Sequence, residues 1–247
     1  MDLGLTGRTA IVGGASAGLG LASAEALAEE GANVVIYARR GELLEGEAKR
    51  IGAVPVVADV REPADLARVV QTAVGRFGGL DIVVANSGGP PPATATELTP
   101  ESVQSAVDLL LKPVVRLVNL ALPYLLESGQ GRIVLIASLA VREPTRNLAL
   151  TNAVRPGVVG YMKSLANELG AQGITVNSVG PGRLATARMK ELYGEGPPAD
   201  ELTQIPAGRL GEPRELGDLV AFLCSRRASY INGTLIQVDG GLARSLL

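Results

Sequence analysis

Short runs of apolar residues alternate along the chain with longer segments in which apolar positions recur every three to four residues. The short runs are rich in Val and Ile, which is typical of buried strands, and the longer segments have the period of helices. The predicted strands are Thr9–Val12, Asn33–Tyr37, Val54–Ala58, Asp81–Ala85, Arg132–Ala137, Thr175–Val179 and Leu235–Val238. The predicted helices include Leu19–Glu30, Pro63–Phe77, Glu101–Leu126, Ala153–Leu169 and Pro213–Ser225.

This alternation predicts an α/β fold in which seven parallel strands form a doubly wound sheet flanked by helices on both faces. The chain has 247 residues, and no linker-like or charge-rich segment divides it. We therefore expect a single domain over residues 1–247. Ligands of doubly wound sheets bind at the carboxyl ends of the strands, so the functional residues should lie there.

Composition excludes several functional classes. The formal net charge of −2 gives no electrostatic basis for binding nucleic acid, and the chain has no His and one Cys, Cys224. Neither a Cys/His zinc site nor an internal disulfide can therefore form, and Cys224 is expected to be a small buried hydrophobe. The amino terminus lacks a basic region, and no uncharged apolar run reaches the roughly 18 residues of a membrane span. These features predict a soluble, cytoplasmic protein that acts on small molecules.

A glycine-rich segment, VGGASAGLG at residues 12–20, directly follows the first predicted strand and opens the first helix. Gly14, Gly18 and Gly20 would let the backbone turn tightly and approach a pyrophosphate, whose charge the first amides of the helix would bind. A tight turn without a ligand is the alternative interpretation. The G-x-x-x-G-x-G spacing resembles the fingerprint of the short-chain dehydrogenase/reductase family, except that Gly13 stands where the family usually has Thr.

The resemblance to this family continues in order along the chain. Asp59-Val60 is similar to the pair that contacts adenine, the segment 85–88 to the N-N-A-G turn, and the segment 177–186 to the N-x-x-x-P-G…T motif beside the nicotinamide. The segments 208–213 and 238–241 are similar to the family's closing motifs. The resemblance implies a Rossmann domain that binds a nicotinamide dinucleotide through Gly14, Ser16, Gly18, Leu19, Gly20, Asp59, Val60, Asn86, Gly88, Arg155, Pro181, Gly182 and Thr186.

The end of the second predicted strand indicates which dinucleotide is used. An acidic residue there would bind the ribose 2′-hydroxyl of NAD, whereas a guanidinium can bind the 2′-phosphate of NADP. Ala38 and Arg39 occupy these positions, so NADP is favoured, with NAD as the alternative. Two observations weigh against this. Arg39 and Arg40 could form a solvated loop, and Ala17 stands where NADP-using relatives often have a second basic residue.

The catalytic positions depart from the family. Relatives use a Ser to hold the substrate carbonyl, a Tyr as general acid/base, a Lys that lowers the pKa of the Tyr, and an Asn from the preceding helix. Ser138 matches the Ser, whereas Thr151, Arg155 and Leu110 stand at the other three positions. Thr is a far weaker acid than Tyr. Arg is permanently protonated, so Arg155 could bind ribose or stabilise an oxyanion but could not shuttle a proton.

Other polar residues could also reach the substrate. Arg142, Asn147 and Asn152 follow Ser138, and Tyr193 lies in a segment, residues 188–210, that closes over the substrate in relatives. Their alternative interpretation is as solvated loop or packing residues. The resemblance further implies a homotetramer or homodimer.

Three functions stay open at this point. The first is an NADP-dependent oxidoreductase similar to 3-oxoacyl-[acyl-carrier-protein] reductases, with Ser138, Thr151 and Arg155 as its catalytic residues. The second is a dinucleotide-binding regulator or redox sensor that has lost turnover. The third is an enzyme of the same fold with different chemistry, and the fold by itself cannot distinguish these three.

Overall fold

Seven parallel strands form one sheet in the computed structural model, which describes residues 2–187, 189 and 199–246. The strands are β1 (Thr9–Gly13), β2 (Asn33–Ala38), β3 (Val54–Val57), β4 (Ile82–Ala85), β5 (Arg132–Ile136), β6 (Thr175–Pro181) and β7 (Leu235–Val238). Their order in space is β3-β2-β1-β4-β5-β6-β7. This is the doubly wound arrangement, so the predicted fold class is confirmed.

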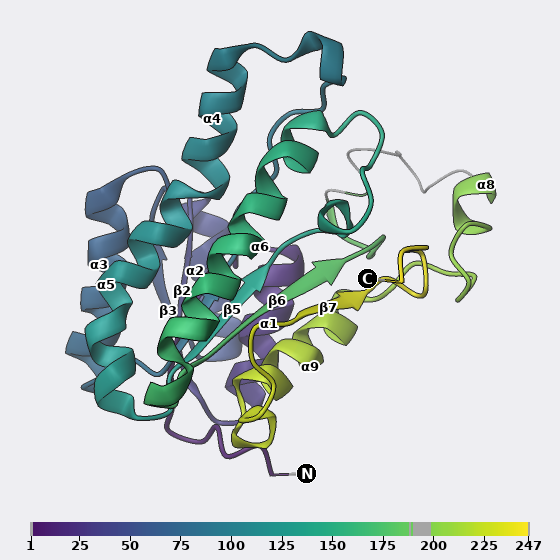
Figure 1. Cartoon of the computed structure of the whole chain (residues 1–247). Helices are drawn as coiled ribbons and strands as arrows, with labels where there is room; N and C mark the ends of the chain where they lie inside the picture. The colour runs from purple at the N-terminus through teal and green to yellow at the C-terminus, as the bar shows by residue number, and fades with distance from the viewer. Residues whose placement is uncertain (1, 188, 190–198, 247) are drawn as a thin grey trace.

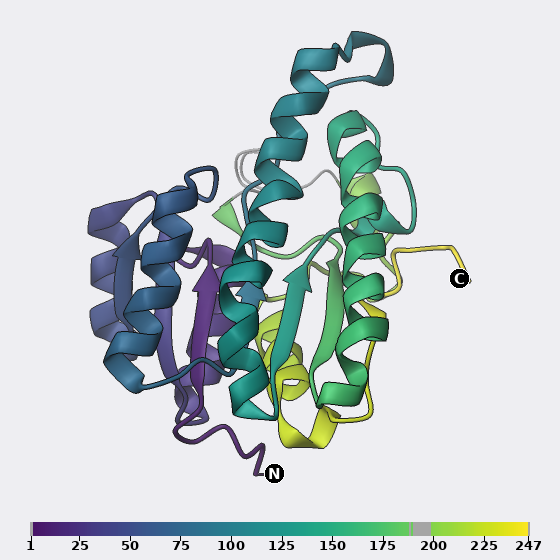
Figure 2. The same cartoon turned by 60° about the vertical axis from the view of Figure 1, so that its left-hand side comes forward.

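Helices cover both faces of this sheet (Figures 1 and 2). The helices are α1 (Gly18–Glu29), α2 (Gly41–Ile51), α3 (Pro63–Phe77), α4 (Pro100–Leu110), α5 (Lys112–Ser128), α6 (Ala149–Leu169), α8 (Ala199–Leu202) and α9 (Pro213–Cys224). Short 3-10 turns are η1 (Ala95–Glu97), η2 (Leu139–Val141), η3 (Gly170–Gln172) and η4 (Arg226–Ala228). One apolar core lies between the sheet and α3, α5 and α6, and a second lies between the sheet and α1, α2 and α9.

The strands end at one side of the molecule, drawn at the top of Figure 1, where α4, the start of α6 and α8 also lie. The amino terminus lies at the opposite end. Strands β1, β4 and β5 are buried along their whole length, which explains why their residues are apolar except for Thr9 and Arg132 at the starts of β1 and β5. Cys224 is buried in the second core, as expected.

The structure corrects the prediction of one continuous helix over Glu101–Leu126. The segment forms two helices, α4 and α5, with a break at Leu111, whose φ of −99° and ψ of −56° depart from regular helix geometry. Pro113 explains the break, because proline has no N–H to donate to residue 109 and its ring disfavours helical geometry in the residue before it. Thr99 and Ser102 form a capping box that starts α4.

The helical stretch Pro100–Ser128 is long and apolar enough to cross a membrane by length and composition, with a mean hydropathy of 1.6 in its most apolar window. One face of α5 packs in the first core, including the buried Val114, Leu117 and Val118. The core helix of a soluble protein satisfies the same criterion, so this stretch is weak evidence for a membrane span. The expectation that the chain has no span stays a prediction.

Candidate cofactor and catalytic site

The glycine-rich loop between β1 and α1 is shaped for close approach of a ligand to the backbone. Gly14 and Gly18 have φ angles of +59° and +62°, which side-chain-bearing residues rarely adopt. A Cβ at Gly20 would lie 2.5 Å from the carbonyl oxygen of Gly13. Asn86, directly after β4, braces the loop by donating from Nδ2 to this same oxygen at 3.0 Å.

Helix α1 begins without a side-chain cap among the described residues, since its N-cap residue is Ala17. The first amides of a helix have no acceptor within the helix and carry the positive end of its dipole. The loop therefore directs uncapped amides toward the carboxyl edge of the sheet, which is the arrangement that binds the pyrophosphate of a dinucleotide. The residues present thus fit a dinucleotide cofactor, as the sequence predicted.

Tyr37 occupies the space that the missing side chain at position 13 would fill. Gly13 and Tyr37 are register partners on β1 and β2, and a Cβ at Gly13 would lie 2.6 Å from Oη of Tyr37. The ring is 2% exposed, and burial raises the pKa of its phenol. Sequence reasoning noted the absent Thr at position 13 but missed Tyr37. The sequence did contain a sign of this contact, because the large Tyr37 lies on the strand predicted to follow the one that ends near Gly13, which has no side chain.

A guanidinium reaches the glycine-rich loop from the end of β2, but it is that of Arg40. Nε and Nη2 of Arg40 donate to Oγ of Ser16 at 3.3 and 3.1 Å. Ser16 is 4% exposed, so this hydroxyl is fixed within the loop. Arg39, which the sequence favoured, is exposed and forms no described hydrogen bond. Both side chains are exposed, so Arg39 is free to bind a ligand, and its predicted contact with the cofactor stays a prediction.

The remaining predicted cofactor residues follow the carboxyl ends of the strands. Thr186 lies over the glycine-rich loop, with its methyl carbon 3.6 Å from the position of a Cβ at Gly18. Gly182 packs against Asp239, and its N–H donates to Val238. The remaining residues lie at the start of α1 (Leu19), after β3 (Asp59, Val60), after β4 (Gly88) and at the end of β6 (Pro181).

Ser138 follows β5 and begins η2, where its Oγ accepts the N–H of Ala140 at 3.1 Å. This bond uses an oxygen lone pair and leaves the hydroxyl proton available for another acceptor. Arg155 on α6 reaches the same strand end, since its Nη1 donates to the carbonyl of Ile136 at 3.1 Å. Arg155 is therefore hydrogen-bonded to Ile136, which lies two positions before Ser138 in the chain.

Arg155 is partly buried, and desolvation lowers the pKa of its guanidinium to about 10, so the group stays protonated at neutral pH. It lines a small pocket of about 20 Å³ together with Tyr37, Asn86 and Leu110. A void of this size holds about one water molecule. Leu110, which the sequence matched to the position of the family's Asn, is 3% exposed. Thr151, one turn before Arg155 on α6, is 6% exposed.

The side-chain amide of Asn152 bonds to the loop that precedes α6. Its Oδ1 accepts the N–H of Thr145 at 3.0 Å, and its Nδ2 donates to the carbonyl of Thr145 at 2.9 Å. Asn147 has a φ of +57°, and its carbonyl accepts the N–H of Ala93. Asn152 therefore positions the loop, which agrees with its alternative interpretation as a loop residue, and a contact with substrate stays a prediction. Tyr193 lies outside the described residues.

Comparison with known proteins gives one consistent result. A family model described as Enoyl-(Acyl carrier protein) reductase matches residues 14–243. The chain is 35% identical to the 3-oxoacyl-[acyl-carrier-protein] reductase FabG of Vibrio cholerae, over 97% of this chain and 99% of that protein. It is 34% identical to dehydrogenase/reductase SDR family member 4 of Oryctolagus cuniculus, over 96% of this chain and 94% of that protein.

Solved structures of reductases superimpose on the fold. The L-sorbose reductase of Gluconobacter frateurii, complexed with NADPH and L-sorbose, is similar with a TM-score of 0.92 and 33% identity over the whole of both chains. The actinorhodin polyketide ketoreductase with NADPH is similar with a TM-score of 0.90 and 32% identity, over 96% of this chain and 98% of that chain.

Proposed function

The chain belongs to the short-chain dehydrogenase/reductase family of oxidoreductases, and from that premise we propose that it interconverts carbonyl and hydroxyl groups with NADP as its cofactor. The observation that carries the proposal is the glycine-rich loop, with positive φ angles at Gly14 and Gly18, at the uncapped start of α1. When bound, the reduced cofactor supplies a hydride to the substrate carbonyl. Gly14, Ser16 and Arg40 would hold its phosphate groups, and Asp59 and Val60 would contact its adenine.

Ser138 and Arg155 act on the substrate oxygen in this proposal. The free hydroxyl proton of Ser138 donates to the carbonyl oxygen and orients it. The charge of Arg155, close to the end of β5, stabilises the negative charge that develops on that oxygen. Water or the hydroxyl of Thr151 delivers the proton. Because neither is a good acid at neutral pH, this step limits the rate.

A dinucleotide-binding regulator without turnover is the second candidate, and the surroundings of Arg155 favour it. The pocket beside Arg155 is lined mostly by apolar side chains, and Tyr37 is the one titratable acid among its described lining residues. Tyr37 is 2% exposed, and burial raises the pKa of its phenol, so it is a poor proton donor at neutral pH. In this candidate function, the chain binds the cofactor but does not turn over a substrate.

One assay distinguishes the two candidates. NADPH binding is followed by fluorescence, and NADPH oxidation is followed with a panel of ketones, keto sugars and 3-oxoacyl thioesters. We expect tight binding and slow but measurable oxidation that Ser138→Ala reduces further. Tight binding with no oxidation of any substrate would identify the regulator, and the absence of NADPH binding would refute both candidates.

We expect NADPH to bind more tightly than NADH, with Arg40 as the main cause. Hydrogen bonds to charged groups contribute about 1.5–3 kcal/mol, so Arg40→Ala should weaken NADPH binding by roughly 10- to 100-fold. Arg39→Ala should have a smaller effect, because this side chain is exposed and unanchored. NADH affinity serves as the control and should change little in either variant. Equal affinities of the wild-type protein for NADPH and NADH would contradict the assignment.

We also expect a homo-oligomer, most simply a tetramer. About two fifths of the most apolar window of Pro100–Ser128 is buried within the chain (39%), so much of this apolar surface is left for a second copy. Light scattering at micromolar concentration measures the mass directly. A monomer of 25.4 kDa would rule the oligomer out.

A further inference from the structure

A second concave site lies at the end of the sheet opposite the cofactor site. It is a cavity of about 660 Å³ at the amino-terminal ends of β5 and β6. This volume lies within the range of small-molecule sites. Its walls come from the loops before the two strands and from the segment around η4, and the residues used below are Arg132, Thr175, Arg226 and Tyr230.

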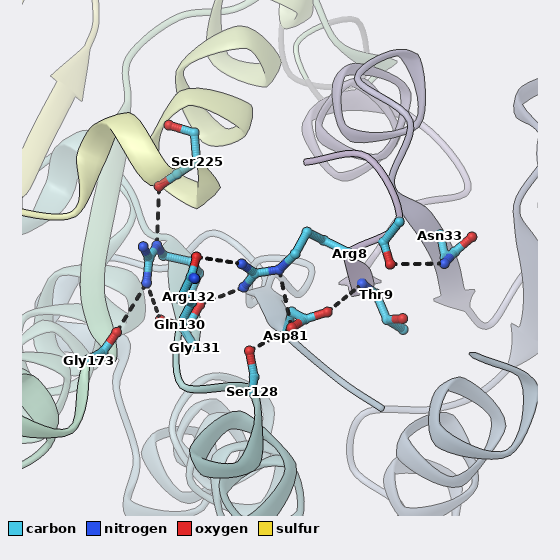
Figure 3. Close-up of polar contacts among 11 residues, drawn as sticks. Arg8, Thr9, Asn33, Asp81, Ser128, Gln130, Gly131, Arg132, Gly173 and Ser225 are labelled. Carbon is cyan, nitrogen blue, oxygen red and sulfur yellow. Dashed lines mark hydrogen bonds and ion pairs between the residues drawn. The ribbon is translucent and has the colours of Figure 1, made fainter. Parts of the chain in front are cut away.

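Arg132 is a buried cation that has no carboxylate partner among the residues that the structure describes. It is 3% exposed, and its Nε donates to the carbonyl of Ser225 at 3.3 Å, while Nη1 donates to the carbonyls of Gly131 and Gly173 at 2.8 and 3.2 Å (Figure 3). These acceptors satisfy N–H groups but supply no negative charge. A buried charge is costly unless it is paired, so this arrangement favours an anion in the adjacent cavity.

The carboxylate of Asp81, which lies beside Arg8, already has its own partners. Asp81 forms an ion pair with Nε of Arg8 at 3.2 Å, accepts the N–H of Thr9 at 2.8 Å and accepts the hydroxyl of Ser128 at 2.6 Å (Figure 3). Burial lowers the pKa of Arg132, and the positive charge of Arg8 lowers it further. The positive charges of Arg132 and Arg226 both repel that of Arg8, and among the described residues neither has an ion pair of its own, which leaves positive charge beside the cavity.

Thr175 supplies the second, independent observation. This first residue of β6 lines the cavity and is 5% exposed, yet its Oγ1 is buried without a hydrogen-bond partner among the described residues. A buried hydroxyl without a partner costs about 1–3 kcal/mol, so such groups are rare unless a ligand or water satisfies them. At the rim, the side chains of Arg226 and Tyr230 are exposed.

We propose that this cavity is a binding site for the phosphate group of a phosphorylated small molecule. The hydroxyl of Thr175 and the guanidinium groups of Arg132 and Arg226 are its donors, which suits a dianion with several acceptor oxygens. The ring of Tyr230, which is fully exposed, offers an apolar surface to the rest of the molecule. The site is separated from the cofactor loop by the length of the strands, so both can be filled together.

Calorimetric titration of the NADPH-saturated protein tests the proposal, with inorganic phosphate and ribose 5-phosphate as probes. Saturating NADPH blocks the cofactor site, so the heat reports the second site. We expect saturable binding of both probes, with the ester bound more tightly. Arg226→Ala should weaken it about tenfold, because it removes a charged donor. Binding of inorganic phosphate alone would point to an adventitious ion only, and would overturn the proposal.

Two further variants separate binding from folding and from general charge. Thr175→Val keeps the shape but removes the unpaired hydroxyl, so it should raise the melting temperature of the free protein while weakening ribose 5-phosphate binding several-fold. Arg227→Ala is the matched charge control. Its Nε donates to the carbonyl of Asp2 outside the cavity, so binding should be unchanged. Equal losses in Arg226→Ala and Arg227→Ala, or no saturation below about 10 mM, would refute the site.

Discussion

Replacing Thr151 with Tyr and Arg155 with Lys together is expected to raise the turnover of ketone and 3-oxoacyl substrates by about 10²-fold or more. General acid catalysis contributes about 10²–10⁴-fold, which corresponds to roughly 3–5 kcal/mol of barrier, and a phenol beside an ammonium group would restore it. Lys would also release the carbonyl of Ile136, which Arg155 now binds. The measurement is the steady-state rate of NADPH oxidation at saturating cofactor.

The single variants are the controls for this experiment. Tyr at position 151 without Lys lacks the cation that lowers its pKa, and Lys at position 155 without Tyr has no acid to activate. Each single change should therefore gain much less than the pair, which a double-mutant cycle measures as positive coupling. Thermal unfolding of all variants checks that the ring fits beside Leu110 in the core. Ordinary reductase rates in the wild-type protein and a slower double variant would show that Thr151 and Arg155 belong to a different mechanism.

Replacing Gly13 with Thr is expected to weaken NADPH binding and lower stability, although it restores the residue that the family usually has. The new Cβ would lie 2.6 Å from both Oη of Tyr37 and the carbonyl oxygen of Asn86, closer than van der Waals contact allows. Overpacking of this kind costs about 1–3 kcal/mol, which corresponds to roughly 5- to 150-fold in an equilibrium constant. Fluorescence titration with NADPH and thermal unfolding measure the two effects.

Tyr37→Val tests whether the ring of Tyr37 fills the space that a side chain at position 13 would otherwise occupy. Alone it should destabilise the protein, because it leaves a cavity beneath the glycine-rich loop. Combined with Gly13→Thr it should recover part of the loss, because the Thr side chain then fills space that the ring has left. Recovery would be incomplete, since the contact with Asn86 remains. Purely additive losses would show that Tyr37 and Gly13 are independent, and that the loop is held by Asn86 alone.

The strands and most helices could be predicted from the sequence because their signals are local. Buried parallel strands such as β4 and β5 need apolar residues on both faces, and helices such as α3 repeat their apolar positions every three to four residues. The glycine-rich loop is also local, since positive φ angles at Gly14 and Gly18 restrict those positions to glycine. The fold class and the place of the cofactor site follow from these patterns.

Contacts between segments that are distant in the sequence could not be predicted in this way. The sequence favoured Arg39 and contained no sign that Arg40 bonds to Ser16, because that contact joins the end of β2 to the glycine-rich loop 24 residues earlier. It could not pair Gly13 with Tyr37, because the register of two strands is set by the whole sheet.

The sequence by itself determined the strands, most of the helices and the fold class, and it predicts a single domain and the replacement of the family's catalytic Tyr, Lys and Asn, because residue identity and spacing carry this information directly. Only the tertiary structure decided that Asn152 bonds to the loop before α6, that Arg155 bonds to the end of β5, and that Arg132 is buried with backbone carbonyls as its acceptors. A hydrogen bond is formed or lost over a few tenths of an ångström. Such distances depend on the packing of all the elements together, which no local pattern contains.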